Sequence, residues 1–183
     1  TLTDVNVYLQ AQNDGNTGDV AFAALGITTD AGANQTTIVR AEDDITMTAG
    51  GLITTQDLVL RAGSGVGATG ANILTTVDTV SGTAGADGFF VQETNDLTIG
   101  NVSNTAGILI DDTTAGSIDV ATTAGDLTII DNVAADGAGT IALAAEGVNT
   151  DVLVGSGADE ASIIGEGGTI ALLAARDVIF ADD

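Results

Sequence analysis

Short runs in which every second residue is apolar recur along the whole chain. They are separated by Gly, Asn, Asp and Thr, and no window has the apolar spacing of a surface helix. Alternate side chains of a strand point to the same face, so each run predicts a short strand with one buried face. The clearest strand starts are Val20, Ile38, Leu58, Val77, Leu97, Ile118, Ile141 and Ile170.

Two phrases repeat within this pattern. Residues 139–145 read GTIALAA and residues 168–174 read GTIALLA. The second phrase, Asp–apolar–any–apolar, begins at Asp4, Asp19, Asp44, Asp57, Asp96, Asp126, Asp151 and Asp177. An Asp placed before a strand is a turn residue, with a side chain that can bond its own backbone. A self-similar phrase with a period of about 20 residues predicts one supersecondary unit per repeat.

We therefore predict an all-β fold, a right-handed parallel β-helix (β-solenoid) with about 20 residues per coil, about eight or nine coils and no evident end caps. A β-sandwich or barrel also has short strands with frequent turns. A phrase repeated in register favours the solenoid. We expect a single domain over residues 1–183, either complete or a segment of a longer repeat protein, with an insertion within residues 155–162.

Composition agrees with a narrow aliphatic interior. Aromatic residues make up only 3% of the chain, against 44% for all hydrophobic residues. The chain has no Pro, which cannot donate to a strand ladder, and it has 25 Gly to supply turns. Few large rings are available, so thin layers of Val, Ile, Leu and Ala must fill the core.

The charge is strongly negative. Lys and Arg together number three, Asp and Glu number 26, and the net charge is −23. This balance argues against nucleic acid or an anionic membrane surface as a partner. No apolar stretch is long enough to insert into a membrane. The absence of His, Cys and Lys removes several kinds of catalytic centre, so we do not expect an enzyme, although carboxylate pairs remain.

Calcium is the metal that the acidic loops would suit, because hard cations prefer clustered oxygen ligands. The loop NDGNTGD (13–19) offers Asp14, Asn16 and Asp19, and glycine-rich segments at 82–89 and 155–162 offer Asp87 and Asp159. The alternative is plain solvated turn charge. We also predict that salt or divalent cations stabilise the fold, because like charges on neighbouring coils repel.

Two arginines occupy matching contexts. Arg40 lies in TIVRA and Arg61 in LVLRA, 21 residues apart, which predicts that they stack on adjacent coils. Their simplest role is as solvated side chains that pair with acids such as Glu42 or Asp57. A basic group near a carboxylate in a lyase-like site is the other possibility.

The phrases GTIALAAEGVNTDVLVGSGA and GTIALLAARDVIF resemble the repeats of large secreted bacterial surface proteins of the filamentous haemagglutinin type. The resemblance implies a parallel β-helix, an extracellular or cell-surface location and a shaft-like structural role, and it carries no catalytic or ligand residue. We expect a subunit or segment of a surface fibre, built by axial stacking head to tail with another copy or with the rest of a longer chain. The alternative is an adhesin segment that binds a glycan or host surface.

Overall fold

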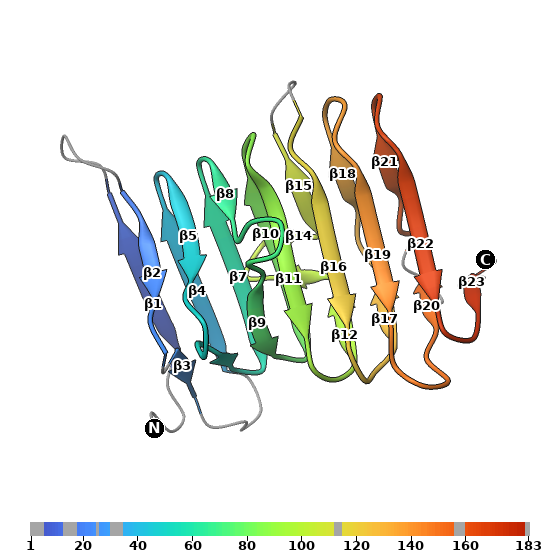
Figure 1. Ribbon diagram of the computed structural model, residues 1–183, viewed down its shortest axis with the longest axis horizontal. Coiled ribbons are helices and arrows are strands. Elements are labelled where there is room, and N and C mark those ends of the chain that lie inside the picture. Colours follow the sequence, from blue (N-terminus) through green and yellow to red (C-terminus); the bar gives the residue numbers. More distant parts are fainter. Residues whose placement is uncertain are drawn as a thin grey trace.

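The computed structural model describes residues 6–12, 18–24, 26–29, 35–111, 115–155 and 160–181, and none of these lies in a helix. The chain winds as a stack of coils from β1 on the N-terminal side to β23 on the C-terminal side (Figure 1). The predicted all-β parallel solenoid is therefore confirmed. The strands are β1 (Val7–Ala11), β2 (Val20–Phe22), β3 (Ile27–Thr28), β4 (Thr36–Ala41), β5 (Asp44–Met47), β6 (Ile53–Thr54), β7 (Asp57–Ala62), β8 (Gly65–Val66), β9 (Ile73–Thr76), β10 (Thr79–Ala84), β11 (Gly88–Glu93), β12 (Leu97–Ile99), β13 (Asn101–Val102), β14 (Thr105–Ala106), β15 (Ile108–Ile110), β16 (Ile118–Thr122), β17 (Leu127–Ile129), β18 (Val133–Ala135), β19 (Ile141–Ala145), β20 (Val152–Val154), β21 (Ile163–Gly165), β22 (Ile170–Ala174) and β23 (Val178–Phe180).

Two parallel sheets form the walls of the solenoid. The first follows the path β1-β4-β7-β10-β12-β17-β20-β23, with β15, β18 and β21 beside it. The second follows β2-β5-β8-β11-β16-β19-β22, with β3, β6 and β9 beside it. Each strand pairs with its equivalents in neighbouring coils, so the sheets grow along the stacking direction.

The coils are longer and fewer than the sequence pattern predicted. Equivalent residues in the first sheet are 19 to 30 positions apart, not a steady 20. The path has eight strands and so seven steps, slightly below the expected eight or nine coils. Some coils carry extra residues at their corners, which stretches the period without changing the strand register. The aligned positions are Val7, Thr37, Leu58, Val80, Ile99, Ile129, Val154 and Phe180.

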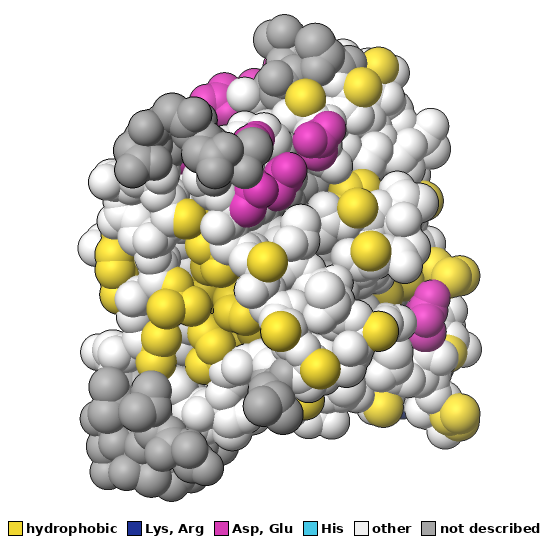
Figure 2. Space-filling view, turned by 60° about the vertical axis from the view of Figure 1, so that its left-hand side comes forward, with side chains coloured by type: hydrophobic (Ala, Val, Ile, Leu, Met, Phe, Trp, Pro, Cys, Tyr) yellow, Lys and Arg dark blue, Asp and Glu magenta, His cyan; other side chains and the backbone are white. Residues whose placement is uncertain are grey.

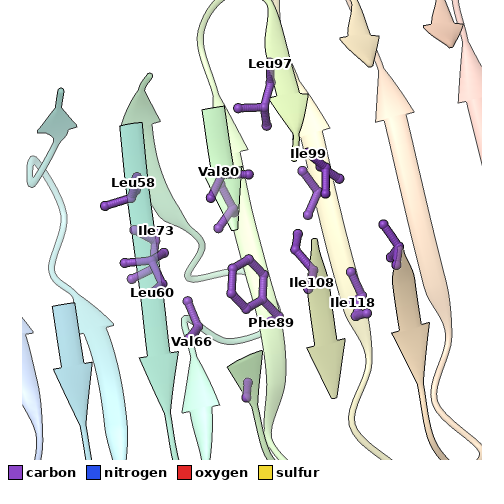
Figure 3. Packing of buried hydrophobic residues seen from close by; sticks show 14 of the residues in the cluster. Leu58, Leu60, Val66, Ile73, Val80, Phe89, Leu97, Ile99, Ile108 and Ile118 are labelled. Atoms are coloured by element: carbon purple, nitrogen blue, oxygen red, sulfur yellow. The ribbon is translucent and has the colours of Figure 1, made fainter. Parts of the chain in front are cut away.

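The core lies between the two sheets and is aliphatic (Figure 3). In the inner coils, residues that alternate along the strands are fully buried, among them Leu58, Val80 and Ile99 in the first sheet. Burial of each such side chain contributes about 1.5–3 kcal/mol relative to exposure. This packing confirms the prediction of thin aliphatic layers.

One large ring is accommodated by a missing side chain opposite it. Phe89 of β11 is fully buried. A Cβ on Gly82 of β10 would come within 2.5 Å of the Phe89 ring and 2.3 Å of the Leu60 carbonyl oxygen. The inward positions aligned with Gly82 in adjacent coils are occupied by Leu60 and Ile108. The glycine therefore makes room for the ring.

A buried carboxylate fastens one corner of the solenoid. Glu93, at the end of β11, has no exposed surface. Its Oε2 accepts hydrogen bonds from the Thr75 hydroxyl at 2.7 Å and the Val77 N–H at 2.9 Å. Its Oε1 accepts from the N–H groups of Thr94 at 2.7 Å and Asn95 at 3.1 Å. These bonds replace the water that the carboxylate loses on burial.

Replacing this carboxylate should weaken the fold substantially. Glu93→Ala leaves the Val77 N–H and the other groups that donate to this carboxylate without an acceptor. We expect the free energy of unfolding to fall by about 3 kcal/mol. Urea denaturation followed by circular dichroism measures the change. The control Glu146→Ala, at an exposed position, should change it by less than about 0.5 kcal/mol. Equal losses in both variants would contradict the assigned role of Glu93.

Candidate functional site

The described part of the chain brings three carboxylates together at one corner of the solenoid. Asp19 precedes β2, and Asp43 and Asp44 lie at the equivalent corner of the next coil. One oxygen from each lies within 4.8 Å of the others. Figure 2, which brings the N-terminal side forward, shows acidic side chains gathered in the upper part of this face. Clustered oxygen ligands of this kind suit Ca²⁺.

Parallel pairing explains why these acids meet. Val20 is aligned with Ile45, so Asp19 and Asp44 occupy the same place one coil apart. The Asp44 N–H donates to Asp19 Oδ1 at 3.2 Å. In the coil after Asp44, Gly65 permits close approach, because a Cβ there would lie 2.8 Å from the Asp87 Cβ and 3.2 Å from Asp44 Oδ1.

Of the five predicted metal ligands, the structure describes two. Asp19 joins Asp43 and Asp44, and Asp87 lies near Asp44. Asp14, Asn16 and Asp159 fall outside the described residues. Each predicted set of ligands came from a single loop, so the carboxylates of Asp43 and Asp44, in the next coil, were missed. The repeated Asp phrase carried the signal, since Asp19 and Asp44 both begin a copy of it.

The electrostatics of this corner act against the ionisation of Asp44. Partial burial raises the pKa of Asp44 above its ordinary value, and the charges of Asp43, Asp87 and Asp19 raise it further. The hydrogen bond from the Gly65 N–H acts in the opposite direction. Ionised Asp44 is therefore less stable in the folded chain than in the unfolded chain.

The two arginines of matching context do stack. Arg40 of β4 and Arg61 of β7 are direct partners in the parallel register. Among the described residues, Arg176 forms ion pairs with Asp151 and Asp177. The predicted pairing of Arg40 or Arg61 with acids such as Glu42 or Asp57 stays a prediction.

A row of acids at another corner links successive coils. Asp96 Oδ1 accepts from the Asp126 N–H at 2.8 Å, and Asp126 Oδ1 accepts from the Asp151 N–H at 2.8 Å. Asp151 Oδ1 accepts from the Asp177 N–H at 3.0 Å. Each Asp opens a copy of the repeated phrase. We expected such side chains to bond their own backbone, but those of Asp96, Asp126 and Asp151 bond the backbone of the following coil.

Arg176 strengthens the last of these links. Its Nε donates to Asp151 Oδ1 at 2.8 Å, and its Nη2 donates to Asp151 Oδ2. This two-point bond to Arg176 lowers the pKa of Asp151 below its ordinary value. The final coil is thereby fixed to the one before it through side chains as well as through strands.

The C-terminal face of the stack exposes side chains that are core residues in earlier coils. Phe180 is 64% exposed, whereas its partner Val154 is 6% exposed. Ile170 is 44% exposed, whereas its partner Ile141 is fully buried. Asp177, the last acid of the row, is also exposed. No described residue covers this face.

Comparisons with known proteins give no family for this chain. No protein-family model matches it, and neither does any curated protein or any solved structure. The parallel β-helix rests on the structure itself, and the filamentous haemagglutinin type remains a proposal. The described residues include no helix with the length and apolar character needed to span a membrane.

Calcium should stabilise the fold through the acidic corner. After treatment with EDTA, millimolar calcium should raise the midpoint of thermal unfolding by a few degrees more than NaCl of equal ionic strength does, because a divalent ion could bridge the carboxylates of Asp19, Asp43 and Asp44. Asp43→Asn should reduce the difference between the two salts. An unchanged midpoint with both EDTA and calcium would remove the calcium hypothesis.

The raised pKa of Asp44 predicts a pH-dependent effect of its removal. In calcium-free buffer at neutral pH, Asp44→Asn should increase the free energy of unfolding, because it removes a charge that the fold disfavours. The gain should disappear as the pH falls through the raised pKa toward about 3, where the carboxyl is protonated in both states.

Urea denaturation across this pH range measures the effect of Asp44→Asn. Asp111→Asn, at an exposed position, is the control and should show little difference at any pH. A stabilisation by Asp44→Asn that grows as the pH falls would have the wrong sign.

Proposed function

We propose that this chain is a structural element of an extracellular fibre or cell-surface shaft. Its coils continue axially beyond its own ends, either into a second copy stacked head to tail or into further coils of a longer chain. The observation that carries the proposal is the exposed C-terminal face, where Ile170, Val178 and Phe180 occupy core positions without a following coil.

The edge strands favour continuation of the same ladders. In the described residues β1 ends the path of the first sheet on one side and β23 ends it on the other. Unpaired strand edges are templates for further pairing unless charge or a bulge blocks them. A second copy placed with β1 beside β23 would extend a parallel sheet in the direction in which it already grows.

The side chains at this face supply the remaining interactions. Apolar residues such as Phe180 would be buried by a following coil, as Val154 is buried within the stack. The Asp177 carboxylate would accept a backbone N–H, as the carboxylates of Asp126 and Asp151 do. An interface that joins two different faces does not close on itself, so repetition of it produces a fibre.

The extracellular location rests on the resemblance to filamentous haemagglutinin-type repeats together with the composition. Surface shafts of that type are parallel β-helices, and this chain has the same architecture. The net charge of −23 would also keep such rods apart laterally.

A second candidate function is an adhesin segment that binds a glycan. The observation in its favour is the antiparallel hairpin of β13 and β14, which departs from the parallel solenoid. A hairpin that projects from a regular solenoid is a suitable place for a binding site, since loops on rigid scaffolds frequently bind ligands.

A charge at the end face should abolish self-association. In Phe180→Lys a charge replaces a side chain that axial stacking would bury, so we expect monomers where the unchanged chain forms rods. Light scattering over a range of concentrations and electron microscopy measure the difference.

The matched control is Leu173→Lys. Leu173 lies in the final coil with a similar exposure, 61% against 64% for Phe180, but it aligns with the outward residue Ala144. The Leu173→Lys variant should leave the rods intact. Equal loss of rods in both variants would point to general charge repulsion, and monomers of the unchanged chain at every concentration would contradict self-association.

A further inference from the structure

The hairpin forms a small second layer on the outer surface of the first sheet. Its turn residues Ser103 and Asn104 have φ angles of 48° and 63°, the left-handed conformation of tight two-residue hairpin turns. The hairpin strand β13 contacts β7 and β10. Val59 and Ser81 point away from the core in these strands, yet they are 1% and 0% exposed. The hairpin covers them.

A pocket of about 150 Å³ lies beside this covered area. Its lining includes the aliphatic side chain of Val59 and the aromatic ring of Tyr8, which belongs to the first coil. Its size is below the roughly 300–1,000 Å³ of sites for drug-sized ligands, so it would hold a smaller ligand. The residues that line it include Tyr8, Arg40, Val59, Arg61, Ser103 and Thr105.

The pocket contains two of the three arginines of a strongly acidic chain. Arg40 and Arg61 are direct partners on adjacent parallel strands, which lie about 4.8 Å apart. Like charges placed directly opposite one another destabilise a sheet. An anion that enters this pocket would meet both guanidinium groups at once.

Arg61 also has an unused donor. Its Nη2 donates to the Thr105 hydroxyl, which fixes the guanidinium against the hairpin. Its Nε is buried and has no hydrogen-bond acceptor within the described structure. A buried donor without an acceptor costs free energy, and the planar guanidinium fork matches a carboxylate at two points.

We propose that this pocket binds an acidic sugar, with the carboxylate of a uronic acid held by Arg40 and Arg61. The aliphatic wall and the Tyr8 ring pack against the C–H face of the sugar, and the hydroxyls of Ser103 and Thr105 meet its hydroxyl groups. A singly charged ligand suits the site better than a multiply charged one, because the net charge of −23 repels anions. The inference concerns the lateral surface and does not depend on axial stacking.

The scarcity of arginine gives a direct test. In a uniformly ¹⁵N-labelled chain, the side-chain Nε–H signals come from Arg40, Arg61 and Arg176 alone. Titration with sodium glucuronate at constant ionic strength should move the signals of Arg40 and Arg61 to saturation. The Arg176 signal should stay in place, because its guanidinium already bonds Asp151. The Phe180→Lys chain keeps the pocket and serves if rods of the unchanged chain are too large for solution spectra.

Variants and ligands separate the parts of the proposal. Arg40→Met and Arg61→Met should each weaken glucuronate binding at least about tenfold. Arg40→Met is the more informative, because it leaves the bond between Arg61 and Thr105 in place. Glucose tests the need for the carboxylate and propionate tests the need for the ring, and both should bind at least about tenfold more weakly than glucuronate.

Three results would overturn the proposal. The first is the absence of saturation below about 100 mM glucuronate. The second is an equal shift of all three arginine signals, which would indicate a general ionic effect. The third is equally tight binding of glucose or propionate, which would show that the acidic sugar is not what the pocket recognises.

Discussion

Backbone hydrogen bonds between parallel strands one coil apart are the interaction on which the rest of this structure depends. They run along the stacking direction in both sheets, so every coil is held by the coil before it and the coil after it. The inward aliphatic residues stack in the same direction, and so do the acids that open the strands. A solenoid of this kind has no central element, and its faces at the two ends differ in character from its sides.

The same repetition places like residues next to one another, with opposite consequences at different corners. In the row from Asp96 to Asp177 the carboxylates of Asp96, Asp126 and Asp151 each accept an N–H from the following coil, which offsets the repulsion between neighbours. At the corner of Asp19, Asp43 and Asp44 the carboxylates lie close together, and the pKa of Asp44 is raised. Arg40 and Arg61 are likewise neighbours of the same charge, here positive. The acidic corner is the place where an added cation would contribute most.

Much of the fold could be predicted from the sequence, because alternation and repetition are local signals. The phrases at Ile141 and Ile170 are direct partners in the second sheet, as their similarity indicated, and Arg40 faces Arg61 for the same reason. The coil length was less predictable, because the residues added at corners follow no period. The hairpin at Asn101–Ala106 was missed, since it interrupts the pattern with only a few polar residues. The acidic corner was predicted in part, because Asp43 and Asp44 reach Asp19 only through stacking.

The contact between Phe89 and Gly82 favours one particular winding of the coils. Most inward positions carry interchangeable aliphatic residues, so a chain displaced by one whole turn would still bury most of its apolar surface. The ring of Phe89, however, fits only where a coil offers an empty place opposite it, and the aligned neighbours of Gly82 are Leu60 and Ile108. A shifted winding would force the ring against one of these branched side chains. The fit between this ring and this glycine therefore favours the native winding over windings displaced by one turn.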